Sequence, residues 1–266
     1  MTDVYPAMPV PGDPSADTLA LEAVDILVAP APTGTAAHIG AIFDVDRTLL
    51  PGTTAERLFL RFLRQHGELG ARAILETAWF AARHLHAPRT ILQGVRRHRP
   101  YLRGKEVAAM ERLGAECFER EIAPRLAVRG VAVLRDHLVA GHTTVLLSGG
   151  LWFLIEPMAA YLGAHHAIAT RLATRVSRGR GRTRAPVLAA SLTGPHPYGA
   201  AKAELLARFA ARNGLDLAQS YSYADHHTDA AMLALVGHPV CVNPDTGLRR
   251  EAIRRGWSIE EFRRPL

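Results

Sequence analysis

The sequence predicts an α/β protein with a doubly wound parallel sheet and an all-helical segment inserted after the first strand. Three observations support this class. Short apolar runs alternate with helical patterns through the second half of the chain, as in parallel strands joined by crossover helices. Glycines follow the predicted helices of that half, where a left-handed residue is expected. Between the first strand and this alternation lie roughly 80 residues of helical periodicity, which is enough for a small domain.

The composition is that of a chain that folds around a core. Of its 266 residues, 48% are apolar and 21% are charged, which is ordinary for a globular protein. No run approaches the ~20 apolar residues that cross a bilayer, and the first residues lack the pattern of a secretory signal. Two cysteines, Cys117 and Cys241, are too few for a disulfide framework. We therefore expect a cytoplasmic protein without a membrane span.

Proline marks the beginning of the chain. Six prolines fall within residues 1–37, so neither a long helix nor a central strand fits there, although residues 19–28 could form one short element. We expect residues 1–37 to be a mostly flexible lead-in. The α/β core is expected to comprise residues 38–52 and 129–266, with the helical insertion at residues 53–128.

Each element is predicted from its own pattern. The first strand is expected at residues 39–43, an apolar run that ends abruptly at Asp44. In the insertion, apolar side chains have the spacing of amphipathic helices near residues 58–63, 74–82 and 107–118. Further strands are predicted near residues 143–147, 167, 221–223 and 240–242, and further helices near residues 131–140, 153–162, 200–213, 229–236 and 248–255.

Reactive side chains occur at the predicted strand ends or in the elements that follow them. They are Asp44 and Asp46 after the first strand, Ser148 and Gly149 after the strand at 143–147, Lys202 early in the helix at 200–213, and Asp225 and Asp229 after the strand at 221–223. Singly, each has an ordinary explanation as a charged loop, a turn hydroxyl, a solvated lysine or a helix cap. Together they are expected to meet at one edge of the sheet, where the carboxyl ends of parallel strands lie.

The order and placement of these residues resemble the haloacid dehalogenase (HAD) superfamily of phosphohydrolases. Its first motif, DxDxT, appears as Asp44, Asp46 and Thr48. The second, third and fourth motifs are matched by Ser148, by Lys202 and by the pair Asp225 and Asp229. The resemblance covers about residues 38–257. It implies a Rossmann-like doubly wound core, and the helical insertion looks like the cap of the phosphoserine-phosphatase-like branch.

The resemblance also implies roles for these residues. Asp44 would attack phosphorus to form an aspartyl-phosphate, and Asp46 would protonate the leaving alcohol and then activate water. Mg²⁺ would be held by Asp44, the backbone carbonyl of Asp46 and Asp225, and Asp229 would orient the metal waters or Lys202. The phosphoryl oxygens would be held by Ser148, the Gly149 N–H and Lys202. A cation is needed because a carboxylate otherwise repels a dianionic phosphomonoester.

Three positions depart from the family pattern. Arg47 stands where a small residue is common, and it is either a substrate contact or a solvated side chain. Ala224 and His226 replace the glycine and serine that commonly flank the first acid of the fourth motif. The pair His226 and His227 could ligate a softer metal, tune a pKa or be ordinary loop histidines. Whether these changes weaken or redirect catalysis is left open by the sequence.

Several features bear on the partner. The net charge of +7 attracts anions of any kind, and the basic residues between 83 and 105 are either a solvated helix face or the mouth for a larger anionic substrate. Glu56 and Arg57 lie near the start of the insertion, but the pair is too common to assign phosphoserine as the substrate. The Arg and Gly alternation at 178–184 predicts an exposed hairpin tip or loop. It lacks interleaved aromatic residues, which argues against a nucleic acid partner.

The leading hypothesis is a Mg²⁺-dependent phosphatase that acts on a small soluble phosphate ester. Two alternatives stay open. The same fold could perform non-hydrolytic chemistry, either phosphoryl transfer to an acceptor or diphosphate-directed chemistry. The chain could also be a basic anion-binding protein with weakened catalysis. The sequence identifies neither the physiological ester nor the oligomeric state.

Overall fold

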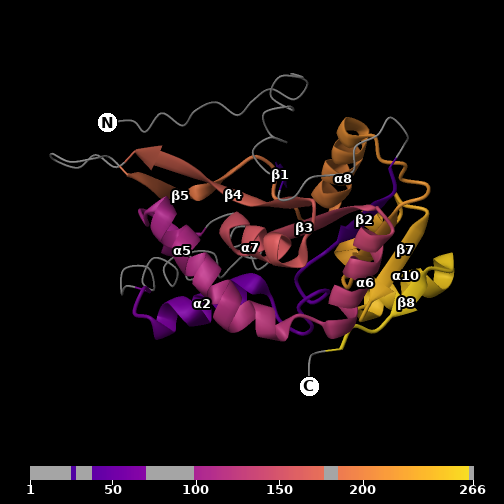
Figure 1. Cartoon of the computed structure of the whole chain (residues 1–266), viewed down its shortest axis with the longest axis horizontal. Coiled ribbons are helices and arrows are strands. Elements are labelled where there is room, and N and C mark those ends of the chain that lie inside the picture. The colour runs from indigo at the N-terminus through magenta and orange to yellow at the C-terminus, as the bar shows by residue number, and fades with distance from the viewer. Residues whose placement is uncertain (1–24, 28–37, 70–98, 177–184, 264–266) are drawn as a thin grey trace, which may run out of the picture.

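The computed structural model describes residues 25–27, 38–69, 99–176 and 185–263. The strands are β1 (Asp25–Leu27), β2 (Gly40–Phe43), β3 (Thr143–Leu151), β4 (His166–Val176), β5 (Pro186–Thr193), β6 (Tyr221–Ala224), β7 (His238–Val242) and β8 (Ser258–Glu260). They form one sheet in the order β1–β4–β3–β2–β6–β7–β8, and β5 pairs with β4 outside this path. The six strands from β4 to β8 along this order are parallel, whereas β1 and β5 run antiparallel to β4 (Figure 1).

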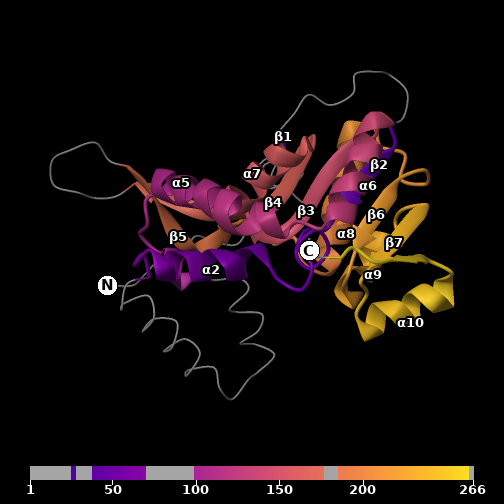
Figure 2. The same cartoon turned by 60° about the horizontal axis from the view of Figure 1, so that its bottom comes forward.

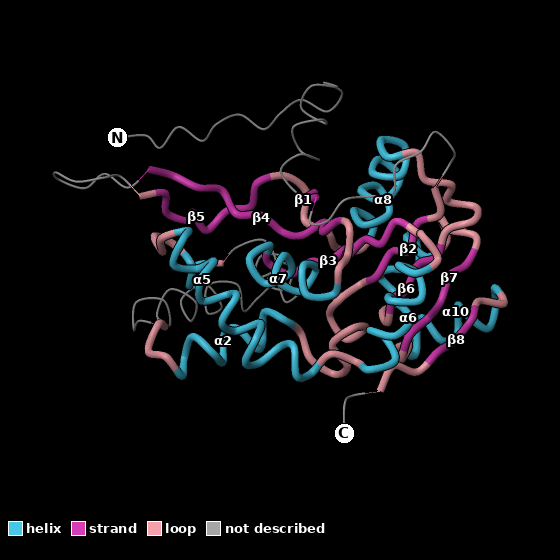
Figure 3. The backbone as a smooth tube through the Cα atoms, viewed as in Figure 1, coloured by secondary structure: helices cyan, strands magenta, loops and turns pink. Residues whose placement is uncertain are grey.

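Each face of the sheet is covered by its own helices, which confirms the doubly wound α/β class. Phe43 packs in the core cluster that contains α6 (Val128–Val139) and α7 (Trp152–Leu162). Its neighbour Ile42 belongs to the cluster of the other helices, because successive side chains of a strand point to opposite faces. These other helices are α8 (Ala200–Asn213), α9 (Ala230–Leu233) and α10 (Thr246–Arg255). Figure 3 shows the alternation of strands and helices along the chain.

The connectivity reverses at β2. From β2 the chain continues to β3 and β4 on one side, and it later returns to β6, β7 and β8 on the other side. Adjacent crossovers therefore leave the sheet in opposite directions between β2 and β6. The carboxyl ends of strands at such a switch point form a crevice, which is where open α/β sheets bind their ligands.

The segment between β2 and α6 contains helices and loops but no strand among its described residues. It contains α2 (Ala55–Gln65), α5 (Val107–Cys117) and three short turns, namely η1 (Pro100–Leu102), η2 (Phe118–Ile122) and η3 (Ala123–Arg125). The helix predicted near residues 74–82 lies outside the described residues. We call the whole segment, residues 53–128, the helical insertion. Figure 2 shows α2, α5 and the β4–β5 hairpin at one end of the molecule and α10 at the other.

The helical insertion is joined to the β4–β5 hairpin by backbone hydrogen bonds. Arg99 N–H donates to the Ala190 carbonyl at 3.1 Å, and Gly104 N–H donates to the Leu188 carbonyl at 2.8 Å. In return, Leu188 N–H donates to the Lys105 carbonyl at 2.8 Å. The free edge of β5 is thus partly paired with the insertion, which limits its capacity to pair with another chain.

Most predicted elements are present, and the differences have local causes. β3 continues through Ser148 and Gly149 to Leu151, with a register shift against β4 after Leu147. The helix predicted at 229–236 is a 3₁₀ turn, His227–Asp229, followed by the four-residue α9, and the Asp229 side chain at their junction bonds to Lys202. The sequence pattern did not reveal β5 and β8, whose pairing partners are other strands of the sheet.

Most of the predicted lead-in and the whole Arg and Gly segment lie outside the described residues. Within residues 19–28, which could form one element, β1 pairs with β4; the remainder of residues 1–37 lies outside the described residues. Residues 178–184 also lie outside them, between the paired strands β4 and β5. Both cysteines are buried free thiols. Among the helices of the described ranges, none has the length and apolar composition to cross a membrane.

One glycine sets the distance between the insertion and the core. Gly114 of α5 faces Phe153 of α7, and a Cβ at position 114 would lie 2.3 Å from the Phe153 carbonyl oxygen. Real Cβ atoms do not approach a backbone atom so closely, so a larger residue would push the two helices apart. The insertion therefore packs on the core at a position where only glycine fits.

We predict that Gly114→Ala lowers the free energy of unfolding by about 1–2 kcal/mol. Alanine stabilises a helix by about 1 kcal/mol relative to glycine. Overpacking a tight contact costs about 1–3 kcal/mol or more. Because the added methyl group would clash with the Phe153 backbone, we expect the net change in stability to be unfavourable. Urea denaturation measures the change. Glu111→Ala, at an exposed position of the same helix, is the control and should change stability by less than about 0.5 kcal/mol. A Gly114→Ala protein more stable than the wild type would contradict this packing.

Candidate active site

A cavity of about 250 Å³ opens at the carboxyl edge of the sheet, at the switch point. It is lined by most of the residues that the sequence singled out. These are Asp44, Asp46, Arg47, Gly149, Lys202, Asp225 and Asp229. Ser148, which precedes Gly149, is fully buried. The structure therefore brings together side chains that are up to 185 positions apart in the sequence, from Asp44 to Asp229.

Asp44 is fixed by the sheet and by its own loop. Its N–H donates to the Tyr223 carbonyl at 2.9 Å, which extends the pairing of β2 with β6 by one residue. The Thr48 hydroxyl donates to Asp44 Oδ2 at 3.0 Å. Only 4% of Asp44 is exposed, so the carboxylate is held in one orientation with little access to bulk water.

Arg47 allows the loop after Asp44 to turn back. Its backbone is left-handed, with φ of 66°, and its N–H donates to the Thr53 carbonyl at 3.0 Å. An L-residue other than glycine in this region costs roughly 1–2 kcal/mol, which explains why a small residue suits this position. The Arg47 side chain is exposed and lines the cavity, so it is available to an anion there.

The Lys202 ammonium group lies between two carboxylates. Nζ donates to Asp44 Oδ1 at 2.6 Å and to Asp229 Oδ2 at 2.8 Å, and all three side chains are buried. Burial alone would lower the pKa of Lys202, but the charges of Asp44 and Asp229 outweigh it and raise the pKa above its ordinary value. The lysine is therefore a permanent cation in the cavity. It is not the solvated surface lysine of the ordinary explanation.

Asp46 connects the core loop to the helical insertion. Its Oδ1 accepts a hydrogen bond of 2.8 Å from the N–H of Ala55, the first residue of α2. Burial, followed by the neighbouring charge of Asp44, raises the pKa of Asp46 to about 7. A carboxyl group with such a pKa can both give and accept a proton near neutral pH.

The two acids of the fourth motif also face the cavity. Burial, together with the charges of Asp44 and Asp229, raises the pKa of Asp225 to about 8. Asp229 occupies the cap position of α9 but makes no capping hydrogen bond with its side chain. Its carboxylate is committed to Lys202 instead, which excludes helix capping as the reason for this residue.

Between the buried Ser148 and Gly150, Gly149 lines the cavity. Gly150 N–H donates to Ser148 Oγ at 3.0 Å, and the Thr170 hydroxyl donates to the Gly149 carbonyl at 2.8 Å, which fixes the orientation of that peptide. A Cβ at position 149 would lie 3.3 Å from His196 Cε1, so glycine leaves room beside this ring. His196 and Thr170 were not singled out by the sequence, because no local motif marks them.

The helical insertion contributes an ion pair to the cavity. The Arg99 guanidinium contacts the Glu56 carboxylate with two nitrogens, Nε at 2.7 Å and Nη2 at 2.9 Å, and the Tyr101 hydroxyl donates to Glu56 Oε1 at 2.7 Å. Arg57, which the sequence placed beside Glu56, is exposed. The partner of Glu56 is thus Arg99, 43 residues later, which local spacing could not reveal.

The basic residues between 83 and 105, predicted to form either a solvated helix face or the entrance for an anionic substrate, have different environments in the structure. Arg99 is only 4% exposed and lines the cavity. Lys105 pairs with Glu68 at 2.7 Å, and Arg103 is exposed. The others, Arg83, Arg89, Arg96 and Arg97, lie outside the described residues. For Arg99, a solvated helix face is therefore the wrong interpretation.

The chemistry of the donor set fits a hard divalent cation. The carboxylates of Asp44, Asp46, Asp225 and Asp229 share the cavity with the ammonium of Lys202, and the pKa values of Asp46 and Asp225 are raised to about 7 and about 8, first by burial. Such pKa values mean that the cluster lacks positive charge for all its carboxylates to ionise. Clustered carboxylate oxygens are the ligands that Mg²⁺ takes in proteins.

A comparison with known families identifies the source of this arrangement. The family model of the haloacid dehalogenase-like hydrolases matches residues 41–234, a range that holds all the carboxylates of the cavity. The chain belongs to this hydrolase family. Membership confirms the resemblance and establishes that the chain is a hydrolase by family.

Bacterial relatives match most of the chain. The "inhibition of morphological differentiation protein" of Streptomyces azureus is 33% identical over 239 residues, which cover 85% of this chain and 79% of that protein. A probable phosphatase of Mycobacterium tuberculosis is 31% identical, with coverage of 88% and 80%. A phosphoserine phosphatase of the same species is 30% identical, with coverage of 84% and 70%.

Solved structures confirm the fold. A protein of unknown function from Bordetella pertussis Tohama I has a TM-score of 0.69 and 26% identity, and the match covers 86% of this chain and 100% of that one. A phosphoserine phosphatase with an analogue of its phospho-aspartyl intermediate has a TM-score of 0.55 and 17% identity, with coverage of 86% and 95%. The latter likeness concerns the fold alone.

We predict that Lys202→Met destabilises the protein, and more so at pH 8 than at pH 5. Removing one partner of a buried ion pair costs about 3–5 kcal/mol. Burial already raises the pKa of Asp44 in the folded state, and without the ammonium this pKa rises further above that of the unfolded chain. The folded state then binds more protons, so its stability falls as the pH rises above about 4.

Urea denaturation at both pH values, in the presence of EDTA, measures this effect. Arg208→Met removes a positive charge from an exposed position of the same helix and is the control. Equal stability of Lys202→Met and the wild type at pH 8 would show that Lys202 does not neutralise the buried acids.

Proposed function

We propose that this hydrolase is a Mg²⁺-dependent phosphatase that cleaves the monoester of a small phosphorylated metabolite. One observation carries the proposal: Lys202 holds Asp44 at 2.6 Å and Asp229 at 2.8 Å in a cavity that also contains Asp46 and Asp225. A nucleophile, a proton donor and anion-binding groups thus occupy one small space. We place the activity in the cytoplasm, because both cysteines are buried free thiols.

In the proposed first step, a carboxylate oxygen of Asp44 attacks phosphorus and the bond from phosphorus to the ester oxygen breaks. Asp46 gives its proton to the leaving alcohol, for which a pKa of about 7 is suited. Lys202 and the N–H of Gly149 hold the phosphoryl oxygens as their charge changes, with the Ser148 hydroxyl beside them. The product is an aspartyl-phosphate at Asp44.

In the proposed second step, water resolves the intermediate. Asp46, now ionised, takes a proton from the water as the water oxygen attacks phosphorus, and the bond to Asp44 breaks. Inorganic phosphate leaves, and Asp46 is again protonated. One carboxyl group therefore serves as acid and then as base. A Mg²⁺ ion bound by Asp44, the Asp46 carbonyl and Asp225, with Asp229 outside this set, would neutralise the repulsion between nucleophile and phosphate.

We further propose that the helical insertion is a cap that contacts the leaving group and determines specificity for it. Thr54, Glu56 and Arg99 of the insertion line the same cavity as Asp44. Glu56 and Arg99 present both charge signs, which suits a leaving group with an ammonium or carboxylate substituent. The match to a phosphoserine phosphatase at 30% identity supports an amino-acid-derived phosphate as the substrate class.

The two alternatives from the sequence have less support. A binding protein without turnover has no need of Asp46, whose hydrogen bond to Ala55 holds it beside Asp44. Non-hydrolytic chemistry needs a second acceptor site, and the described cavity offers no feature that distinguishes one. Of the three hypotheses, hydrolysis gives a role to the largest number of the polar groups that line the cavity.

Phosphate release from p-nitrophenyl phosphate tests the function. We expect activity that EDTA removes and that added Mg²⁺ restores, and Asp44→Asn should lower kcat by at least about 10³-fold, because the nucleophile is lost. Asp136→Asn, at an exposed position of α6, is the control and should keep full activity. Activity that survives EDTA or Asp44→Asn would refute the proposal. If no phosphate ester is hydrolysed in a panel of sugar, amino-acid, nucleotide and lipid-headgroup phosphates, non-hydrolytic chemistry becomes the better hypothesis.

A second test concerns the leaving group. Glu56→Gln keeps the shape of the side chain but removes its charge, so KM for phosphoserine or histidinol phosphate should rise about tenfold or more, the cost of about 1.4 kcal/mol of binding. The kcat/KM for p-nitrophenyl phosphate, which lacks charged substituents, should change less than about twofold. Arg57→Gln alters the exposed neighbour and is the matched control. An equal loss of kcat/KM on all three esters would show that Glu56 does not contribute to recognition of the leaving group.

A further inference from the structure

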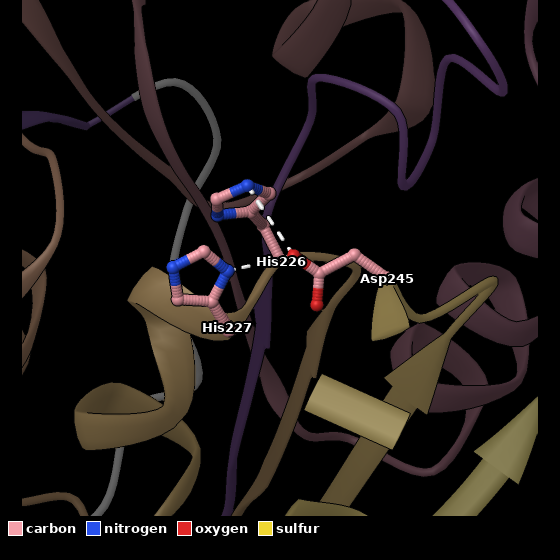
Figure 4. A group of neighbouring side chains, drawn as sticks. All are labelled: His226, His227 and Asp245. Carbon is pink, nitrogen blue, oxygen red and sulfur yellow. Dashed lines mark hydrogen bonds and ion pairs between the residues drawn. The ribbon is translucent and has the colours of Figure 1, made fainter. Parts of the chain in front are cut away.

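Three side chains with metal-ligating atoms meet beside the cavity, outside the set of carboxylates around Lys202. His226 and His227 follow Asp225 in the loop after β6, and Asp245 caps the start of α10. One ligand atom from each lies within 4.8 Å of the other two. Figure 4 shows both imidazole rings turned toward the Asp245 carboxylate.

The two carboxylate oxygens of Asp245 have separate tasks. Oδ1 accepts the N–H of Leu248 at 2.7 Å and so caps α10. Oδ2 faces the histidines, at 2.7 Å from His227 Nδ1 and 3.4 Å from His226 Nε2. The cap fixes the carboxylate in the helix while its second oxygen stays directed at both rings.

The two contacts that Asp245 makes with the histidines suit a tetrahedral cation. Zinc binds imidazole nitrogen and carboxylate oxygen at about 2.0–2.2 Å, so two of its ligand atoms lie about 3.3 Å apart. The contact between His226 and Asp245 already has this length, and the contact between His227 and Asp245 needs to lengthen by about half an ångström. His227 is exposed, so its ring is able to move by this amount.

Neighbouring groups support the arrangement. His226 Nδ1 accepts the N–H of Thr228 at 3.3 Å and lies 2.9 Å from the Thr228 hydroxyl, so this side of the ring is held by Thr228 while Nε2 faces the carboxylate. Gly247 has no side chain, and a Cβ there would lie 2.9 Å from His227 Cβ. The absence of a side chain at position 247 lets His227 lie against the first turn of α10.

We propose that His226, His227 and Asp245 form a binding site for a transition-metal dication of the Zn²⁺ class, distinct from the carboxylate set that suits Mg²⁺. Two imidazoles and one carboxylate are the ligands of a borderline cation, whereas Mg²⁺ prefers oxygen alone. Three protein ligands leave a fourth position for water or for an anion. This site does not depend on the phosphatase proposal, since it uses none of its catalytic residues.

Occupancy would clamp the loop after β6 to α10. The backbone already links them, because Asp245 N–H donates to the Asp225 carbonyl at 2.8 Å. A metal ion bound by His226, His227 and Asp245 would add a second link between them, formed by side chains. The loop that carries Asp225 and Asp229 would then be held at two points, and His226 would bring the ion to the wall of the cavity.

Equilibrium dialysis against Zn²⁺, with millimolar Mg²⁺ present throughout, tests the site. The chain carries Asp225→Asn in this experiment, which weakens the carboxylate set as a competing site for Zn²⁺. We expect one bound Zn²⁺ per chain in this background, and binding at least about tenfold weaker when His227→Gln is added. His238→Gln removes another exposed histidine and should leave binding unchanged. Zn²⁺ should also raise the Tm of Asp225→Asn but not that of the double variant.

Two results would overturn the site. Zn²⁺ binding that is equal with and without His227→Gln would mean that the cluster is an ordinary pair of histidines beside a carboxylate. The absence of Zn²⁺ binding in the Asp225→Asn background would mean the same. Phosphate release by His227→Gln alone, in Mg²⁺, keeps the two proposals apart, since it should match the wild type whether or not the Zn²⁺ site exists. Asp245→Asn retains a capping oxygen for α10 and gives a second, fold-preserving test of the ligand set.

Discussion

The interaction on which the site depends is the buried ammonium of Lys202 between Asp44 and Asp229. Like charges a few ångströms apart repel by several kcal/mol where the effective dielectric constant is near 20, so these carboxylates cannot be ionised together without a cation. Lys202 supplies one positive charge, and its raised pKa keeps it charged. The cluster still holds more acid than base, and the raised pKa values of Asp46 and Asp225 express this deficit. A bound divalent cation would supply the missing positive charge.

The fold assembles this cluster by placing each group at the same edge of the sheet. Asp44 follows β2 and Asp225 follows β6, which are neighbouring parallel strands at the switch point. Lys202 comes from the first turn of α8, on the face opposite to α6 and α7. No two of these residues need to be near in sequence, because the carboxyl ends of parallel strands converge whatever the length of the connections.

The first turn of α2 contacts both the proposed catalytic acid and the ion pair proposed to bind the leaving group. The N–H of Ala55 orients Asp46, the proposed acid, and the next residue, Glu56, pairs with Arg99 at the wall of the cavity. A movement of the helical insertion would therefore act on both residues at once. The close contact between Gly114 and Phe153 limits such movement, since α5 rests directly on backbone atoms of α7. The placement of the insertion is thus a condition for the proposed catalysis as well as for specificity.

The sequence by itself determined the α/β class, the order of most elements and the acids, lysine and glycine of the cavity, because hydrophobic periodicity and motif spacing are local properties of the chain. Tertiary structure alone decided which groups are partners. It paired Glu56 with Arg99 instead of Arg57, turned Asp229 from its helix to Lys202, placed β5 beside β4 and the insertion, and brought Asp245 to His226 and His227. The reason is physical: a long-range contact depends on where the packed elements bring two side chains, and the number of residues between them does not encode that position.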